Sequence, residues 1–448
     1  MNRAAVLLAA VAALGLAGCS KAVRDPAAQY GANPALPGPK QFLFPPMGVA
    51  PPVGWKNGEM PTVPAGFTIT PFATGLHSPR NVLGLPNGDV LVVESGDPGL
   101  EPVKRPKDLV FKWALSQAHG PTKAGNRLLL LRDTNGDGRA DTQTVLIPKL
   151  DSPFGIVALG GYLYVAETGD IMRYPFKPGD SAVGPGVKLA DLPKGTIDHH
   201  WTKSLTASPD GSRLYVGVGS DSNITENGLD AEEGRAAIYE VHPEDGAKRI
   251  YASGLRNPNG LTFNPTSGQL WAVINERDEL GNDLVPDYLT HVTPGAFYGW
   301  PYSWYGQHVD ARVKPQKPDL VKSAIPPDYS LSSHVAPLGL AFENGTAFPA
   351  AYKGGAFVGE HGSWDRTKFN GYQVAFVPFA GGMPSGKAQT FVGGFLTKDG
   401  KHAHGRPVGV GFDSTGALLV ADDLGNAVWR VAPSGPLSPA PIAKPPSR

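Results

Sequence analysis

The chain of 448 residues contains 40 lysines and arginines and 40 aspartates and glutamates, so its formal net charge is zero. Such a chain lacks the broad basic surface that binds nucleic acid, and we expect no nucleic-acid partner. Hydrophobic residues make up 41% of the chain, with 57 glycines and 45 prolines, which indicates a globular, turn-rich protein with a large core. The single cysteine excludes an intramolecular disulfide, a thiolate metal cluster and a Cys-x-x-Cys-His haem site.

The first 18 residues resemble the signal peptide of a bacterial lipoprotein. Arg3 precedes an apolar run over residues 4–16 that is too short to span a membrane, and small residues lead to the only cysteine, Cys19. Residues 16–19, Leu-Ala-Gly-Cys, are similar to a lipobox, whose cysteine becomes the lipid-modified N-terminus. We therefore expect an exported protein that is lipid-anchored through Cys19 on the periplasmic face of the cell envelope, at the outer membrane. An ordinary signal peptide with an incidental cysteine is the alternative.

Two proline-rich segments flank the part of the chain that has regular patterns. Residues 19–64 contain many Pro, Ala and Gly residues with little periodicity, which predicts a tether or an arm wrapped around the folded domain. Residues 433–448 are again proline-rich, and we expect a frayed tail there. The predicted folded domain covers residues 65–432.

One pattern recurs six times in this domain: a short alternating apolar run, a turn with glycine, and a second run rich in Val, Leu, Tyr and Ala. The copies cover residues 82–93, 155–165, 205–216, 261–273, 339–359 and 408–420, with turn glycines Gly88, Gly161, Gly211, Gly268, Gly354 and Gly416. These glycines are about 66 residues apart on average, which leaves room for a four-stranded sheet and a long loop in each copy. Six such units without helical periodicity predict an all-β fold, a six-bladed β-propeller, closed by pairing of residues 67–70 with residues 427–430. A large β-sandwich with recurring hairpins is the alternative.

The long loops of a propeller gather at one end of its central channel, so residues far apart in sequence can meet there. Asp198, His199, His200 and Trp201 stand just before the third copy. A neutral imidazole can take a proton from a hydroxyl group, and a neighbouring aromatic ring can stack on a planar ligand. His200 is therefore a candidate catalytic base and Trp201 a candidate ligand contact. A structural histidine pair or a surface metal site would give the same pattern.

Polar residues in other loops are candidates for the same end of the channel. Arg256 and Asn257 offer a planar cation for a carboxylate and an amide that both donates and accepts, although alone they form a turn with a cation. Residues 275–283 hold four carboxylates, including Glu276, which suit either a hard cation such as calcium or a solvated loop. Further polar groups occur at residues 332–334, 360–366 and 404–407, each of which by itself is typical of an ordinary polar loop.

A separate loop has the ligand spacing of an EF-hand calcium site. Asp133, Asn135, Asp137 and Asp141 occupy positions one, three, five and nine of such a loop, and a glycine stands at position six. Thr144 replaces the glutamate expected at position twelve, and no helical pattern flanks the loop. We predict a structural calcium site without a catalytic role, and a plain Asp/Asn/Gly turn is the alternative.

Several of these motifs, taken in order, resemble the glucose/sorbosone dehydrogenase family. The likeness is carried by His200 with residues 205 and 209–211, then by residues 219–223, 254–258, 275–278, 298–301 and 361–364. It covers roughly residues 65–432 and is greatest with the L-sorbosone dehydrogenase-like branch. Several ordered motifs over most of the chain are more specific than any one of them alone.

This resemblance implies a six-bladed propeller that binds pyrroloquinoline quinone and a calcium ion. It implies oxidation of an aldose or sorbosone-type sugar at the anomeric or aldehyde carbon, with electrons passed to a separate acceptor. It implies that His200 removes the proton of the sugar hydroxyl, and that Arg256, Asn257 and Arg406 contact the cofactor, with Trp201 beside it. Fixed cations suit the carboxylates of the cofactor, while the metal polarises its carbonyl and the protein supplies orientation and a base.

The chain departs from the better-known soluble glucose dehydrogenases at three places. Lys368 or Arg366 takes the place of their cofactor-binding lysine, residues 151–154 replace a glutamine near the second copy, and the calcium loop differs, with Glu276 as its candidate ligand.

Two other classes of function stay open. A calcium-dependent propeller hydrolase similar to lactonases would use the acidic loops to activate water, and a noncatalytic lipoprotein scaffold would keep the blades alone.

Overall fold

The computed structural model describes residues 25–41, 48–56, 58–99, 109, 123–195, 200–343, 345 and 347–435. Cys19, Asp198 and His199 lie outside these residues, as does nearly all of the predicted C-terminal tail. Strands dominate the described part, and its helices are short: η1 (Pro26–Gln29), η2 (Asp230–Glu232), α3 (Pro318–Ser323) and η3 (Ala350–Tyr352).

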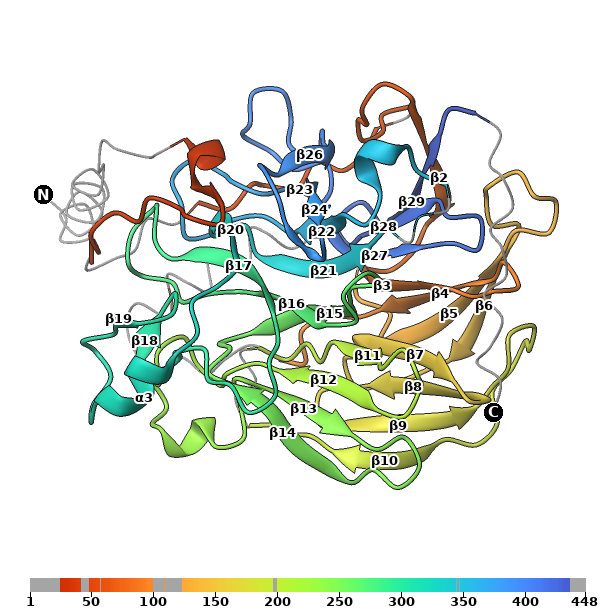
Figure 1. The fold of residues 1–448 in the computed structure, drawn as a ribbon. Coiled ribbons are helices and arrows are strands. Elements are labelled where there is room, and N and C mark those ends of the chain that lie inside the picture. The colour runs from red at the N-terminus through yellow and green to blue at the C-terminus, as the bar shows by residue number, and fades with distance from the viewer. Residues whose placement is uncertain are drawn as a thin grey trace, which may run out of the picture.

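Six sheets of four or five strands are arranged around a common centre (Figure 1). The first three contain β3 (Pro79–Gly84), β4 (Val90–Glu94), β5 (Arg127–Arg132) and β6 (Thr142–Ile147); β7 (Gly155–Leu159), β8 (Tyr162–Ala166), β9 (Asp170–Pro175) and β10 (Val187–Asp191); and β11 (Leu205–Ala207), β12 (Leu214–Val218), β13 (Ala237–Val241) and β14 (Lys248–Ser253).

The other three sheets contain β15 (Pro258–Phe263), β16 (Leu270–Ile274), β17 (Pro286–His291), β20 (Tyr329–Ser333) and β1 (Tyr30–Gly31); β21 (Pro337–Phe342), β22 (Ala356–Glu360), β23 (Gln373–Val377) and β26 (Gln389–Val392); and β27 (Pro407–Phe412), β28 (Leu418–Asp422), β29 (Ala427–Pro433) and β2 (Phe67–Thr74). Two short hairpins complete the described strands: β18 (Ser303–Trp304) with β19 (His308–Val309), and β24 (Phe379–Ala380) with β25 (Met383–Pro384).

The predicted six-bladed propeller is confirmed. Each of the six repeated patterns corresponds to the first two strands of one sheet, and each of the six turn glycines has a positive φ. The ring closes where β2 pairs with β29, with Thr70 opposite Arg430. The last blade therefore combines three C-terminal strands with one N-terminal strand, as the sequence predicts.

The second strand of most blades is buried on both faces. All five residues of β4, β12, β16, β22 and β28 are buried. Neighbouring blades cover both sides of such a strand, so its sequence is a continuous apolar run and does not alternate. This explains why the repeats were recognisable from their second apolar runs.

Glycines on the first strands allow neighbouring blades to approach each other. These strands contact one another in the ring β3, β7, β11, β15, β21 and β27. A Cβ atom on Gly339 in β21 would lie 2.3 Å from the carbonyl oxygen of Val408 in β27, and one on Gly409 would lie 2.7 Å from the Cα of Asn81 in β3. The obstructing atoms belong to the backbone of the next blade, so they cannot move without separating the blades.

Replacing Gly339 with alanine is expected to lower the free energy of unfolding by about 1–3 kcal/mol, the usual cost of overpacking a buried site. Gly38 is a matched control, because no atom lies within 4 Å of a Cβ built there. Urea denaturation of both variants measures the difference. Equal effects at the two positions would contradict the role of Gly339 in blade contact.

The connections between strands alternate between the two ends of the propeller, because successive strands of each sheet are antiparallel. Connections after the second and fourth strands of a blade share one end, which we call the mouth. Connections after the first and third strands lie at the opposite end. The mouth connections carry His200, Arg256, Glu276, His361 and Arg406.

The N-terminal proline-rich segment lies along the propeller wherever it is described. β1 pairs with β20, and Figure 1 shows this part of the chain beside that blade. The buried Gln29 donates a hydrogen bond to the carbonyl of Asp283 (2.9 Å), and Thr62 exchanges backbone hydrogen bonds with Gly393. The described residues of this segment thus form a wrapped arm.

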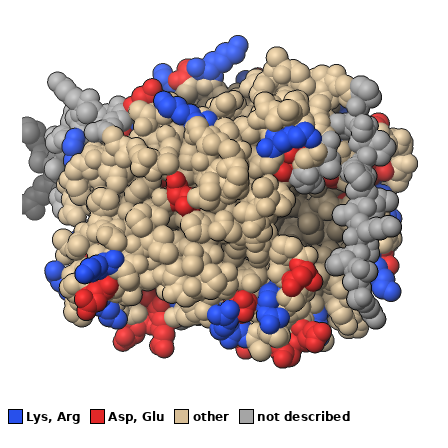
Figure 2. Space-filling view, viewed as in Figure 1, with Lys and Arg blue, Asp and Glu red and all other residues tan. Residues whose placement is uncertain are grey.

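Charged side chains of both signs are interspersed on the face shown in Figure 2, mostly towards its edge. This distribution agrees with the zero formal charge of the chain. None of the helices in the described ranges has the length and apolar character needed to cross a membrane.

Candidate active site

His200 lies at the mouth, just before β11, and its ring orientation is set by the loop that follows β12. Its Nδ1 atom is 2.9 Å from both the carbonyl oxygen and the hydroxyl oxygen of Ser220. A carbonyl oxygen only accepts, and the Ser220 hydroxyl donates its own hydrogen to the carbonyl of Ser222 (2.6 Å). Nδ1 therefore carries the ring proton, and Nε2 carries the lone pair that a catalytic base needs.

Asn257 lies next to His200, with Gly219 between them. A Cβ atom on Gly219 would be 2.4 Å from Cβ of His200 and 2.5 Å from Oδ1 of Asn257. Asn257 is buried, and its Oδ1 atom has no hydrogen-bond partner in the described structure. A buried amide oxygen without a partner carries a desolvation cost that a bound ligand with a donor group would remove.

Arg256 is buried and holds two mouth loops together. Its guanidinium donates to the carbonyl and the side-chain oxygen of Asn223, to the carbonyls of Asn275 and Glu276, and to the carboxylate of Asp278. The distances range from 2.6 Å to Glu276 to 3.3 Å to the Asn223 carbonyl. The predicted cofactor-binding residue Arg256 thus also orders the loop that contains the predicted calcium ligand.

A second group of mouth residues surrounds the buried carboxylate of Asp423. This carboxylate accepts from Arg80 Nη1 (2.6 Å), His361 Nε2 (2.9 Å) and Arg406 Nε (3.3 Å). Burial alone would raise the pKa of Asp423, but Arg406, His361 and Arg80 outweigh burial and hold that pKa well below its usual range. The carboxylate is therefore ionised, and its ion pairs fix the two guanidinium groups.

His361 is neutral in this group. Burial lowers the pKa of its ring, Asp423 opposes that shift, and the neighbouring arginines reinforce it, giving a pKa of about 4. With His361 neutral, two guanidinium groups face the Asp423 carboxylate, and the charge of Asp97 also acts on Arg80. Guanidinium groups fixed at a channel mouth suit an anionic ligand.

Trp201 belongs to an apolar cluster beside these cations. It packs with Phe154, Leu338 and Val408, which lie at or next to the mouth ends of three first strands. The guanidinium of Arg80 lies 5.5 Å from the centroid of the Trp201 ring. Phe154 comes from the stretch 151–154 that departs from the soluble glucose dehydrogenases. Together these residues form a buried apolar cluster that adjoins fixed cations.

The other predicted site residues lie elsewhere or face other groups. Glu276 is at the mouth but buried, where burial raises its pKa, and its carboxylate accepts from the backbone N–H groups of Arg277 (2.9 Å) and Tyr305 (3.4 Å). Lys368 is exposed, whereas Arg366 is buried and pairs with Asp283 (3.2 Å). The role proposed for Glu276 stays a prediction. That of Lys368 is also untested, and its exposure favours Arg406 over it as the cofactor contact.

The EF-hand-like loop is far from the mouth loops in the topology. Residues 133–141 join β5 to β6 at the opposite end of the propeller. Asp133 accepts from the backbone N–H groups of Gly136 and Gly138, and Asp141 accepts from Thr134 and Asn135. Calcium binding by this loop stays a prediction, and its position separates it from chemistry at the mouth.

Arg80 and Asp423 are the mouth residues that the sequence reasoning missed. Asp423 directly follows the second strand of its blade, as Asn275 and His361 do in theirs. Arg80 is the second residue of a first strand. Aligning the six copies by strand position would have shown Asp423, whereas Arg80 stands in a short Pro-Arg-Asn stretch with no charge pattern of its own.

The family model for glucose/sorbosone dehydrogenases matches residues 187–363, which include His200, Arg256, Asn257 and Glu276. A second model, TrAA12-like, matches residues 311–434. Over these residues the chain resembles the glucose/sorbosone dehydrogenase family.

Relatives of this chain include proteins with described activities. It is 24% identical over 239 residues to a pyrroloquinoline quinone-dependent sugar dehydrogenase of Hypocrea jecorina, covering 50% of this chain and 49% of that protein. It therefore spans about half of that relative's length. It is also 29% identical over 295 residues to an uncharacterized protein of Borreliella burgdorferi, covering 63% of this chain and 76% of that protein.

A solved structure shares the fold of this chain. The pyrroloquinoline quinone domain of Coprinopsis cinerea pyranose dehydrogenase, in its holo form, superposes with a TM-score of 0.67 at 19% identity and covers 86% of this chain and 100% of that one. At this identity the structural similarity shows the propeller fold alone. The ligand and the substrate must be inferred from the residues of the site. It does not single out the sorbosone branch within the family.

The mouth residues fit a planar polyanion such as pyrroloquinoline quinone. Asp423 holds Arg80 and Arg406 in place, Trp201 belongs to a buried apolar cluster beside them, and the Asn257 Oδ1 atom is buried without a partner in the described structure. These features are what a flat ring system with several carboxylates requires.

Proposed function

We propose that this protein is a pyrroloquinoline quinone-dependent dehydrogenase that oxidises an aldose or sorbosone-type sugar at its anomeric or aldehyde carbon. Electrons would leave to a separate acceptor, and calcium would accompany the quinone. The observation that carries the proposal is the tautomer of His200, whose Nδ1 proton is bound by Ser220 so that Nε2 is a base. The relatives that depend on the quinone and act on sugars support it.

In the proposed reaction His200 accepts the proton of the sugar hydroxyl at Nε2. Ser220 keeps the imidazole in the required tautomer and stabilises the imidazolium through the Nδ1 proton. Arg80, Arg406 and Asn257 would hold the cofactor, with Arg256 ordering the adjacent loops. When bound, the quinone supplies a two-electron acceptor for the hydride of the sugar.

The charge at the mouth favours this function over the two alternatives. A hydrolase that activates water on a cation needs carboxylates to hold that cation, whereas two guanidinium groups already pair with the Asp423 carboxylate. A scaffold requires neither a histidine held in one tautomer nor two arginines fixed at the mouth.

Dye-linked oxidation by the full-length protein tests the proposal. A panel of aldoses and sorbosone is offered with and without added quinone and calcium, and quinone binding is followed by its absorbance. Activity that requires both additions supports the dehydrogenase. Quinone binding without oxidation of any sugar would contradict the substrate class, and absence of quinone binding would favour the hydrolase or the scaffold.

We also propose that Cys19 anchors the exported protein to the periplasmic face of the outer membrane by lipid. Replacing Cys19 with serine is then expected to move most of the protein from the membrane pellet to the soluble fraction of the envelope, because only the acyl chains hold it there. Fractionation followed by immunoblotting measures the shift. Unchanged membrane association of the Cys19→Ser variant would exclude a lipid anchor at this residue.

A further inference from the structure

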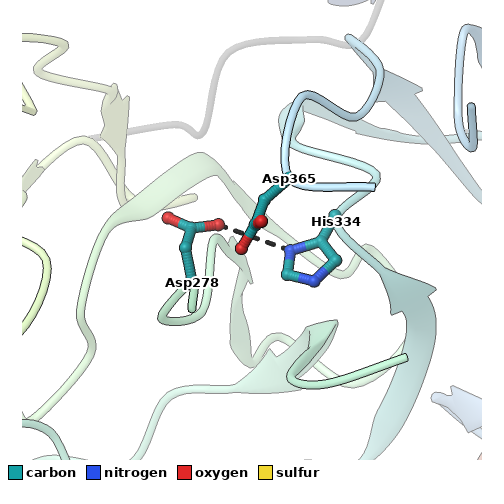
Figure 3. A group of neighbouring side chains, drawn as sticks. All are labelled: Asp278, His334 and Asp365. Atoms are coloured by element: carbon teal, nitrogen blue, oxygen red, sulfur yellow. Dashed lines mark ion pairs between the residues drawn. The ribbon is translucent and has the colours of Figure 1, made fainter. Parts of the chain in front are cut away.

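Three side chains from three different mouth loops meet at one buried point: Asp278, His334 and Asp365 (Figure 3). Asp278 follows β16, His334 lies between β20 and β21, and Asp365 follows β22. One ligand atom from each lies within 4.8 Å of the other two. At most 9% of any of the three residues is exposed to solvent. The loops of two blades therefore converge on a nitrogen and two carboxylate oxygens.

Each of the three side chains is held by its other polar atom. His334 Nε2 donates to the carbonyl of Gly281 (3.1 Å), Asp278 Oδ2 accepts from Arg256 (3.1 Å), and Asp365 Oδ2 accepts from the backbone N–H of Glu279 (2.8 Å). This leaves His334 Nδ1 3.3 Å from Asp278 Oδ1, with the remaining oxygen of Asp365 beside them. Metal-binding histidines and carboxylates are oriented by outer contacts of this kind.

An independent observation points to a missing ligand. Asp365 is fully buried, and its Oδ1 atom has no hydrogen-bond partner in the described structure. A buried carboxylate oxygen without a donor is costly, and a cation bound between the three side chains would remove that cost.

We propose that Asp278, His334 and Asp365 bind a divalent transition-metal ion, Zn²⁺ or one of similar preference. One imidazole and two carboxylates form the nitrogen and oxygen ligand set that such ions accept, and further positions stay open for water or a carbonyl. Calcium is disfavoured, because it takes six to eight oxygen ligands. The site is distinct from residues 133–141 and from Glu276, and it stands whether or not the protein oxidises sugars.

The metal would join three loops and set the position of Arg256. Asp278 offers one oxygen to the metal and keeps the other on the guanidinium of Arg256. Arg256 in turn binds Asn223 and the 275–278 loop. The ion would act as a structural clamp at the mouth and would not need to touch a substrate.

Calorimetric titration of chelator-treated full-length protein with Zn²⁺ tests the proposal. One Zn²⁺ per chain is expected to bind saturably. Asp365→Asn is expected to weaken binding by about 100-fold or more, since it removes a direct ligand and not an outer contact. This variant retains an acceptor for the N–H of Glu279, and thermal unfolding shows whether it folds. Asp141→Asn, in the loop at the opposite end, is the matched control and is expected to leave Zn²⁺ binding unchanged.

Zn²⁺ is also expected to raise the Tm of the wild type and not that of Asp365→Asn, because an ion that binds only the folded state stabilises it. Absence of saturable binding, or binding that survives both Asp365→Asn and His334→Gln, would show that the three side chains form a buried ion pair only. Tighter binding of Ca²⁺ than of Zn²⁺ at this site would overturn the assignment of the ion.

Discussion

Replacing His200 with alanine is expected to lower turnover by about 10²- to 10⁴-fold, the range of a lost general base. The affinity for pyrroloquinoline quinone should change little, because the cations and the apolar cluster assigned to the cofactor do not depend on the imidazole. The proposed base is the Nε2 atom of His200, because its Nδ1 atom is bound to Ser220. Steady-state kinetics with a dye acceptor, together with a quinone titration, separate the two quantities.

Ser220→Ala is the matched control for this variant. It removes the hydroxyl that accepts from His200, but the Ser220 carbonyl remains 2.9 Å from Nδ1 and still selects the tautomer. Its expected effect on turnover is therefore less than about tenfold, below the range for a lost base. The pH profile provides a second readout, since loss of the base should remove the acidic limb of the rate profile.

Unchanged turnover of the His200→Ala variant would exclude His200 as the base. His361, which is also neutral and lies on the Asp423 group, would then be the next candidate. Equal losses in His200→Ala and Ser220→Ala would show that the hydroxyl is needed to orient the ring, and that the Ser220 carbonyl alone does not select the tautomer.

The blades could be predicted because their evidence is local. Each first hairpin combines two apolar runs with a turn glycine at positive φ, as at Gly88 and Gly416, and these signals lie within about a dozen residues. Ring closure could be predicted as well, because residues 67–70 form an alternating apolar run outside the six copies and pair with β29. Strand β1 was not predictable in this way, because Tyr30 and Gly31 sit in a proline-rich stretch with no alternation.

The mouth was only partly predictable, because its contacts join residues hundreds of positions apart. His200, Arg256, Asn257 and Arg406 were found through ordered motifs, but Asp423 pairs with Arg80 across 343 positions. The meeting of Asp278, His334 and Asp365 likewise depends on how three loops fold over two blades. The composition of such loops shows that they are polar. Which of their side chains pair with one another can be seen only in the folded structure.

Arg406 and Lys368 were both predicted from the sequence to contact the cofactor, but the structure places them in different surroundings. Replacing Arg406 with alanine is expected to weaken quinone binding by about 10- to 100-fold, the cost of one charge-assisted hydrogen bond. Arg406 is held by Asp423 at 3.3 Å, with part of its side chain exposed at the mouth. Lys368 is exposed on its loop, and Lys368→Ala is expected to change the affinity by less than about twofold, as for an unpaired surface charge.

Quinone titration monitored by fluorescence measures both affinities, and thermal unfolding shows whether the Arg406→Ala variant keeps its fold. Asp423 retains Arg80 at 2.6 Å and His361 at 2.9 Å in that variant, so its carboxylate is not left unpaired. Arg406→Lys is expected to fall between the wild type and Arg406→Ala, because it keeps the charge but loses the planar fork. An equal or greater loss in Lys368→Ala would place the cofactor over the 361–372 loop, and the positive charge around Asp423 would then need another anionic ligand.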